Sequence, residues 1–344
     1  MKLYARIIAL AMTVALLASC SSAAPSSSKT PAAPASGAPA ASEAVVAKSS
    51  YPEKPIVAIV AFNPGGGTDI AARTILKHAE KYAGTNFVVD NKPGAGGAIG
   101  WSAIATAPTD GYTIGMINPP SVIFNPITLG DKVKYTMADF QPIANFVSDP
   151  GACVVQPESK FKTFQDMIDF AKANPDELRI AYSGPGTSEA LTIRRLEQAF
   201  DIKLRKIPFD GTGPMMTALM GDNADVMFAN VSEIVPQYKA KTMRVLAVGS
   251  EKRVDIMPEA PTYIESGFEQ TQIAMRGLAA PAGMDPEMVK TLAAAMEKTF
   301  ADPEFQKAAA DLCLPLDYLG PDAYKAKLDE LDAFYRDEFA KNPW

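Results

Sequence analysis

IVAIVAFNPGGGTDI (56–70) and FVVDNKPGAGGAIG (87–100) share one pattern, in which an apolar strand enters a glycine-rich turn and a helix begins directly after it. A third strand is predicted over 112–117. Glycine allows a sharp turn and the close approach of a ligand. A helix that starts there presents unpaired N–H groups, which favour negative charge. The block therefore predicts an anion-binding platform at the carboxyl ends of parallel strands.

The second half of the chain repeats this alternation. Thr163 and Asp166 form a capping-box pattern that predicts a helix to about residue 174. Further on, the turns SGPGTS (183–188) and FDGTGP (209–214) each follow a short strand and lead into a helix. Strands are predicted over 179–182, 204–207, 225–228 and 245–248. Alternating strands and helices indicate an α/β fold with doubly wound, mostly parallel sheets.

The first residues have the features of an export signal. Lys2 and Arg6 precede an apolar run over 7–18, too short to span a bilayer, and Leu-Ala-Ser leads to Cys20. We interpret 1–19 as a signal peptide and Cys20 as a lipidated N-terminus; an ordinary signal peptide with an incidental cysteine is the alternative. Residues 21–50 are rich in Ser, Ala and Pro, so 20–50 should form a flexible tether.

About 290 residues remain, more than one core usually serves, so two lobes are expected. The first lobe would combine 51–147 with 273–344, and the second would hold 148–272. The chain would cross outward within 118–150 and return over 273–280. Crossings of this kind form a hinge, about which two lobes can close on a ligand.

The chain also resembles the substrate-binding proteins of tripartite tricarboxylate transporters, the Bug family. Seven matching stretches follow one another in the family's order: FNPGGGTDIAAR (62–73), VVDNKPGAGGAIG (88–100), PTDGYTI (108–114), SGPGTSEA (183–190), IPFDGTGPMMTALMGDNADVMFAN (207–230), APTYIESGF (260–268) and RGLAAPAG (276–283). The resemblance implies a two-lobed periplasmic-binding-protein (Venus-flytrap) fold. It also implies that backbone amides and hydroxyls of the turns hold a mono-, di- or tricarboxylate.

Carried onto this sequence, the resemblance implies a ligand site divided between the lobes. Its residues would be Phe62, Asn63, Gly65, Gly66, Thr68, Asp69, Gly94, Ala95, Gly96, Gly97 and Ser121 in the first lobe, and Ser183, Gly186, Thr187, Ser188, Gly211, Thr212, Asp225 and Asn230 in the second. Asn63 and Met275 depart from the family's usual residues, so the choice among carboxylates stays open. Arg276 could meet an anion, but we favour a salt bridge at the surface or the hinge.

Enzyme chemistry has little support in this sequence. The motif over 94–99 lacks the last glycine of a dinucleotide fingerprint, and neither a phosphate-binding loop nor a nucleophile elbow is present. His78, the single histidine, has the spacing of an ordinary helix position. The carboxylates Asp69, Asp110 and Asp225 could support a hydrolase, but each also fits a capping, turn or strand-end role. We therefore expect a binding protein and not an enzyme.

Composition limits the partners further. The formal net charge is −6, and no basic patch interleaved with aromatics appears, so nucleic acid is an unexpected partner. The sequence has no Cys/His cluster of the kind that binds a metal, and no cofactor is expected. Cys153 and Cys313 are expected as separate thiols, with a disulfide as the alternative. We expect a monomeric extracytoplasmic lipoprotein, in the periplasm or on the outer face of the cytoplasmic membrane, that serves the membrane subunits of a transporter. A sensor that reports ligand to a signalling receptor could use the same fold.

Cys20→Ser tests the anchor. Nothing else in the sequence is predicted to hold the protein to a membrane, so the variant should move from the membrane fraction to the soluble fraction. Cell fractionation followed by a salt wash measures this, and a variant that stays with the washed membranes would contradict lipidation.

Overall fold

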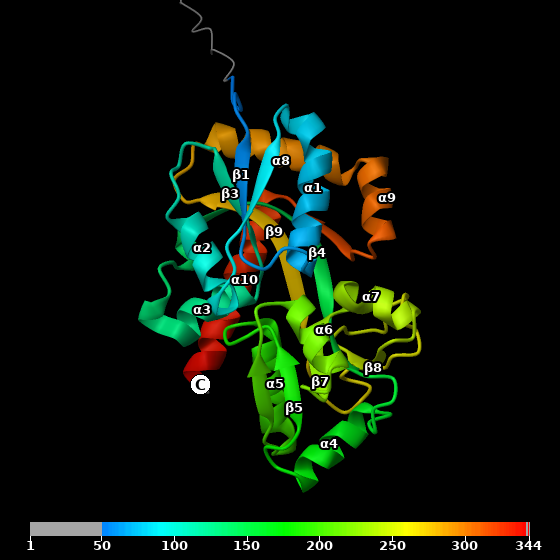
Figure 1. Ribbon diagram of the computed structural model, residues 1–344. Helices are drawn as coiled ribbons and strands as arrows, with labels where there is room; N and C mark the ends of the chain where they lie inside the picture. Colours follow the sequence, from blue (N-terminus) through cyan, green and yellow to red (C-terminus); the bar gives the residue numbers. More distant parts are fainter. Residues whose placement is uncertain (1–49, 342, 344) are drawn as a thin grey trace, which may run out of the picture. The chain divides into compact units, whose positions relative to one another are not determined.

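The computed structural model describes residues 50–341 and residue 343, so the predicted signal peptide and Cys20 lie outside the described residues. Residues 49–344 form one compact unit. Its chain builds an α/β fold of two lobes, each with a central sheet and flanking helices (Figure 1). None of the helices in the described part is long and apolar enough to cross a membrane.

The first lobe is built around three parallel strands in the order β2-β1-β3. These strands and the helices between them are β1 (Ile56–Val60), α1 (Gly67–Ala83), β2 (Phe87–Asn91), α2 (Ala98–Ala105) and β3 (Thr113–Ile117). A 3-10 turn over Ala95–Gly97 precedes α2. Both strand–glycine turn–helix units read from the sequence are present, with α1 beginning at the third glycine of its turn.

The second lobe contains a matching parallel group, in the order β7-β5-β6. Its elements are α4 (Phe164–Ala173), β5 (Arg179–Tyr182), α5 (Ser188–Phe200), β6 (Arg205–Pro208), α6 (Thr212–Met220), β7 (Val226–Asn230), α7 (Val231–Lys239) and β8 (Arg244–Val248). The capping box predicted at the start of α4 is formed, because Thr163 and Asp166 exchange side-chain and backbone hydrogen bonds.

Two long antiparallel strands connect the lobes. The first half of β4 (Phe140–Val155) pairs with β9 (Ile273–Pro281), and its last residues pair with β7 and β8. At the changeover, Gly151 N–H donates to Gln272 O, Gln272 N–H to Gly249 O and Gly249 N–H to Gly151 O, each at 2.7 Å. A Cβ at Gly151 or Gly249 would collide with Gln272. β4 overlaps the segment in which the outward crossing was predicted and β9 the one predicted for the return, whereas the division into lobes and its boundaries stay a prediction.

The remaining elements complete the first lobe. They are α3 (Ser121–Leu129), two 3-10 turns at Gly130–Lys132 and Met137–Asp139, α8 (Pro286–Phe300), α9 (Pro303–Asp311), β10 (Leu316–Leu319) and α10 (Pro321–Lys341). Neither α3 nor α7 was predicted from the sequence. Both are nine residues long and contain an internal proline, Pro126 and Pro236. Proline and short length weaken the helical pattern in a sequence.

Apolar side chains form a core on each face of both sheets. In the first lobe, Trp101 of α2 is fully buried and its Nε1 donates to Met116 O at 3.1 Å. His78 lies on α1 against Phe305, with Nδ1 2.8 Å from Thr74 O, which suits a packed helix position. Cys153 and Cys313 are both free thiols.

Gly100→Ala tests the close packing of α2 on β1. A Cβ at Gly100 would lie 2.6 Å from Ala61 Cα, a backbone atom that cannot move independently, so overpacking should cost about 1–3 kcal/mol of unfolding free energy. Gly320→Ala is the control, because a Cβ there meets nothing within 4 Å. Denaturant unfolding measures both, and equal stabilities would contradict the packing argument.

Candidate functional site

A cavity of about 110 Å³ lies where the carboxyl ends of the parallel strands of both lobes meet. Loops that follow β1 and β3 line it from the first lobe, and loops that follow β5, β6 and β7 line it from the second. This is the topological position at which α/β sheets bind ligands. Pockets for drug-sized ligands run from about 300 Å³ upward, so a cavity of this size suits a small solute.

Most of the predicted site residues line this cavity. The first lobe supplies Phe62, Asn63, Gly65, Gly66, Thr68 and Ser121, and the second supplies Ser183, Thr187, Ser188, Gly211, Thr212 and Asn230. The structure thus brings the two predicted walls together around one space. The part that each residue plays in binding stays a prediction.

The other predicted residues lie outside the cavity lining: Asp69, Gly94, Ala95, Gly96, Gly97, Gly186 and Asp225. Asp225 precedes β7, whereas Asn230 ends it, so about 16 Å of strand separates Asp225 from the cavity end. There Asp225 pairs with Arg179 at 2.7 Å.

Gly186 and the glycine turn over 94–97 pack against neighbouring residues and do not line the cavity. A Cβ at Gly96 would strike the carbonyl of Pro185, and one at Gly186 would strike the side chain of Asn125. Gly97 lies under the ring of Trp101. At Gly96 and Gly186 the absence of a side chain thus lets the two lobes approach closely.

Asp69 fixes the shape of the first turn. Its carboxylate accepts from Gly65 N–H at 2.9 Å, from Arg73 Nε at 3.0 Å and from Asn91 Nδ2 at 2.9 Å. Burial alone would raise the pKa of Asp69, but these hydrogen bonds outweigh it and lower that pKa. The charged carboxylate of Asp69 therefore holds the glycine turn over 65–69 in place without lining the cavity itself.

The helices that begin at the cavity differ in how their first amides are satisfied. Gly66 and Gly211 are the N-cap residues of α1 and α6, and a glycine has no side chain with which to cap. By contrast, Thr187 caps α5 through Ala190 N–H. Asn230 and Glu233 form a capping box at the start of α7. Amides free to meet a ligand are thus concentrated at α1 and α6, one helix from each lobe.

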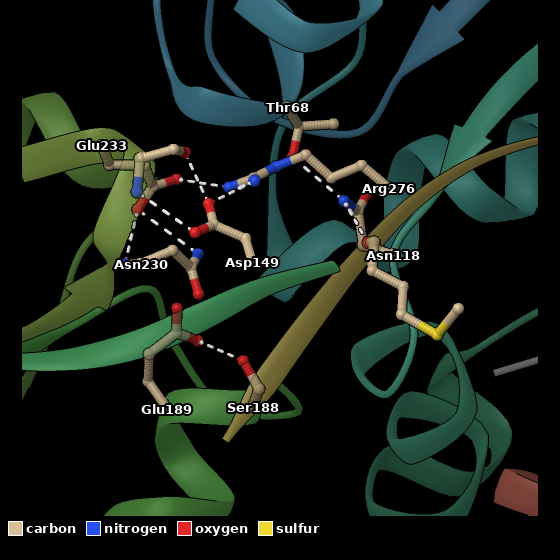
Figure 2. Close-up of polar contacts among 10 residues, drawn as sticks. Thr68, Asn118, Asp149, Ser188, Glu189, Asn230, Glu233 and Arg276 are labelled. Carbon is tan, nitrogen blue, oxygen red and sulfur yellow. Dashed lines mark hydrogen bonds and ion pairs between the residues drawn. The ribbon is translucent and has the colours of Figure 1, made fainter. Parts of the chain in front are cut away.

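A buried ionic network borders the cavity (Figure 2). Arg276 of β9 is 1% exposed; its Nη1 lies 2.5 Å from Asp149 Oδ2, and its Nη2 lies 3.2 Å from Glu233 Oε1. Asp149 also accepts from Ser232 N–H at 3.1 Å and from its hydroxyl. The expected salt bridge exists, and of the two expected places, the surface and the hinge, it lies at the hinge, between the connecting strands β4 and β9. The side chain is enclosed and lines the cavity.

Glu189 and two asparagines complete the polar lining. Glu189 is 5% exposed, and its burial, followed by the charge of Glu233, raises its pKa. Asn118 Nδ2 donates to Thr68 Oγ1 at 3.0 Å and to Met275 O at 3.3 Å. Among the described residues, Asn118 Oδ1 is buried without a hydrogen-bond partner. Unmet acceptors beside a cavity mark places where a ligand can donate.

The walls touch each other directly. Ser188 N–H donates to Ser121 Oγ at 3.1 Å, and Asn63 Nδ2 donates to the carbonyl of Asp210. Each of these hydrogen bonds joins one lobe to the other, so the structure shows the cavity with its walls together.

Several residues that line the cavity were not predicted from the sequence. Those with the most polar side chains are Asn118, Glu189 and Glu233. Asn118 directly follows β3, which the sequence did predict, so its position at a strand end was a usable signal. Glu189 lies in the first turn of a predicted helix, where an acidic side chain usually faces solvent, and Glu233 lies on α7, for which no helix was predicted. Among the described residues, no group of His, Cys, Asp or Glu could hold a metal ion.

The two-lobed fold and the cavity between its sheet ends define a substrate-binding protein of the periplasmic type. Residues 71–342 match the tripartite tricarboxylate transporter family receptor, and the chain belongs to this family. A relative from Pseudomonas sp. (strain P51), the UPF0065 protein in the tcbD-tcbE intergenic region, is 32% identical over 76% of this chain and 79% of its own. The family and fold are those of extracytoplasmic binding proteins, not of enzymes.

Solved structures support the same assignment. The periplasmic binding protein BugD superimposes with a TM-score of 0.79 at 29% identity, over 85% of this chain and 98% of its own. MatC from Rhodopseudomonas palustris with bound malate has a TM-score of 0.77 at 24% identity, covering 83% of this chain and 99% of its own. R. palustris Rpa4515 with adipate has a TM-score of 0.78 at 24% identity, covering 84% and 97%. The last two show likeness of fold.

Arg276→Ala tests the ionic network. The substitution leaves Asp149 and Glu233 buried without their cation, so it should cost about 3–5 kcal/mol of unfolding free energy. Arg253→Ala is the control, because Arg253 pairs with Glu265 at a half-exposed site and should cost about 1 kcal/mol or less. Denaturant unfolding of both variants measures the difference, and similar losses would contradict a structural role for the buried network.

Proposed function

We propose that this protein is an extracytoplasmic receptor that captures a small carboxylate between its lobes. The observation that carries the proposal is the meeting of two glycine-capped helix N-termini, those of α1 and α6, in one small cavity. Each offers first-turn amides and the positive end of a helix dipole. One carboxylate at each end, or one held between them, would satisfy both sockets.

Hydroxyl groups beside these helix ends add donors to the sockets. Thr68 Oγ1 accepts from Asn118, which leaves its own O–H to donate into the cavity. Thr212 begins α6 on the opposite wall and is buried there. Donors from opposite lobes would make a bound carboxylate a bridge, so the ligand would favour the state in which the walls meet.

Two binding proteins of the same fold, MatC with malate and Rpa4515 with adipate, support a dicarboxylate as the reference ligand. Membership of the receptor family supports delivery to the membrane subunits of a tripartite tricarboxylate transporter. In this proposal the lipid on Cys20 and the tether would hold a monomeric receptor near that transporter. Closure of the lobes would be the signal that the membrane subunits recognise.

A thermal-shift screen against mono-, di- and tricarboxylates, with neutral sugars as the comparison, tests the proposal. A carboxylate at about 100 times its Kd should stabilise the protein by about 2.7 kcal/mol. Gly66→Val should abolish this shift: Gly66 has φ −76°, which valine can adopt, but the added side chain would occupy the socket. Pro185→Ala is the control and should keep the shift, because a backbone socket does not use the proline ring.

Stabilisation by sugars and by no carboxylate would overturn the ligand class. The closure step has its own readout, small-angle scattering with and without the stabilising carboxylate. Ligand should reduce the radius of gyration in the parent protein and in Thr217→Ala, which alters the same helix outside the cavity. The reduction should be smaller in Thr212→Ala. An unchanged radius at saturation would indicate a preformed pocket.

A further inference from the structure

The charges around the cavity are unfavourable for an anionic ligand. Glu189 and Glu233 line the cavity, and Arg276 is the one cation among the described residues that line it. Asp149 also pairs with Arg276, so three carboxyl groups surround a single guanidinium group. A bound carboxylate would add to this excess of negative charge, and like charges repel each other strongly where little water is present. The ligand would bind more tightly if one of these carboxyl groups took up a proton.

Glu189 is the carboxyl group that has no cation. None of the ion pairs among the described residues includes it, and its side chain accepts from Ser188 Oγ at 3.3 Å. Figure 2 shows both patterns, with Arg276 joined to Asp149 and Glu233, and Glu189 joined to Ser188. Glu189 is 5% exposed, so water compensates little of its charge.

The surroundings of Glu189 favour its uncharged form. Burial, followed by the charge of Glu233, raises the pKa of Glu189, and these effects outweigh hydrogen bonds from its own N–H and from the Ser183 and Thr187 hydroxyls. A protonated carboxyl group has an O–H that can donate and keeps an oxygen that can accept. The same side chain that repels a carboxylate when charged can therefore donate a hydrogen bond to it when neutral.

We propose that a carboxylate ligand binds together with a proton that Glu189 takes up, so that the affinity of the cavity for its ligand falls as the pH rises. This inference rests on the proposed carboxylate site and adds a proton-coupled specificity residue to it. The amides at the starts of α1 and α6 hold the carboxylate, and neutral Glu189 removes the repulsion from the opposite wall.

The other titratable groups near Glu189 are less suited to take up this proton. Asp149 and Glu233 each bond to Arg276, and a proton on either would weaken that ion pair. Tyr263 lies close enough to be affected by the charge of Glu189, but burial raises the pKa of Tyr263 well above its ordinary value, so its phenol already carries its proton. Glu189 is thus the residue whose protonation breaks no ion pair.

The direction of the pH dependence follows from the charges. A bound carboxylate adds negative charge, so it raises the pKa of Glu189 above its value in the ligand-free protein. Full affinity is then available below the pKa of the ligand-free protein and is lost as the pH rises through the higher pKa of the complex. Between these two pKa values, the affinity falls by up to about tenfold per pH unit. Acidification would favour loading of the receptor, and alkaline conditions would favour release.

Isothermal titration calorimetry with propionate, succinate and glutarate tests the coupling from about pH 6 to about pH 9, a range that lies mainly above the titration of simple carboxyl groups. At each pH, two buffers of different ionisation enthalpy reveal the protons that binding takes up. In the parent protein, a probe that binds should take up a proton, and its Kd should rise by about tenfold or more across the range. Glu189→Gln keeps the size of the neutral acid but cannot titrate, so its Kd should change by less than about twofold and binding should take up no proton. Glu197→Gln, on α5 but outside the cavity, should keep the pH dependence of the parent protein.

The outcomes separate this inference from the proposed function. A probe that binds the parent protein with a constant Kd and no proton uptake would overturn the coupling and leave the carboxylate receptor intact. A pH dependence that survives in Glu189→Gln would place the proton on the ligand or on another residue and would also overturn it. Failure of all three probes, in a protein whose unfolding shows that it is folded, would overturn the coupling together with the carboxylate site. The buffer comparison in the parent protein needs no variant, so it remains decisive if Glu189→Gln does not fold.

Discussion

The pairing of Arg276 with Asp149 and Glu233 is the constraint on which the site depends. It joins β9, β4 and the first turn of α7, and so ties both connecting strands to the second wall of the cavity. Burying these charges is unfavourable unless they stay together. The position of α7, and with it that of Asn230, therefore follows from the crossing strands. The hinge and the binding wall share one set of side chains.

Around that network, the ends of the helices take two distinct forms. Where glycine caps α1 and α6, the first backbone amides of the helix are left for a ligand. Where Thr187, Asn230 and Glu233 cap α5 and α7, side chains of the protein bond to the backbone at the helix start. The same secondary-structure motif, repeated around one cavity, thus produces a donor side and an acceptor side.

Much of the fold could be predicted because its local signals agree. The glycine turns after apolar strands placed α1, α5 and α6. The site was harder to predict, because which residues line it depends on which side chains become buried when the chain folds. Gly96 and Gly186 look like ligand-binding glycines, yet they pack against Pro185 and Asn125. Glu189 looks like a solvated first-turn acid and becomes a buried one only when the second wall meets the first.

The place of β9 has a consequence for biosynthesis. In the first lobe this strand lies between β3 and β4, so the sheet stays open until residues beyond 273 have been made. Contacts across so long a stretch of chain form slowly. The second lobe, in contrast, takes β5, β6 and β7 from consecutive sequence. During vectorial synthesis the second lobe can fold early while the first waits with an exposed edge, which is the interval in which a chaperone would have the most to bind.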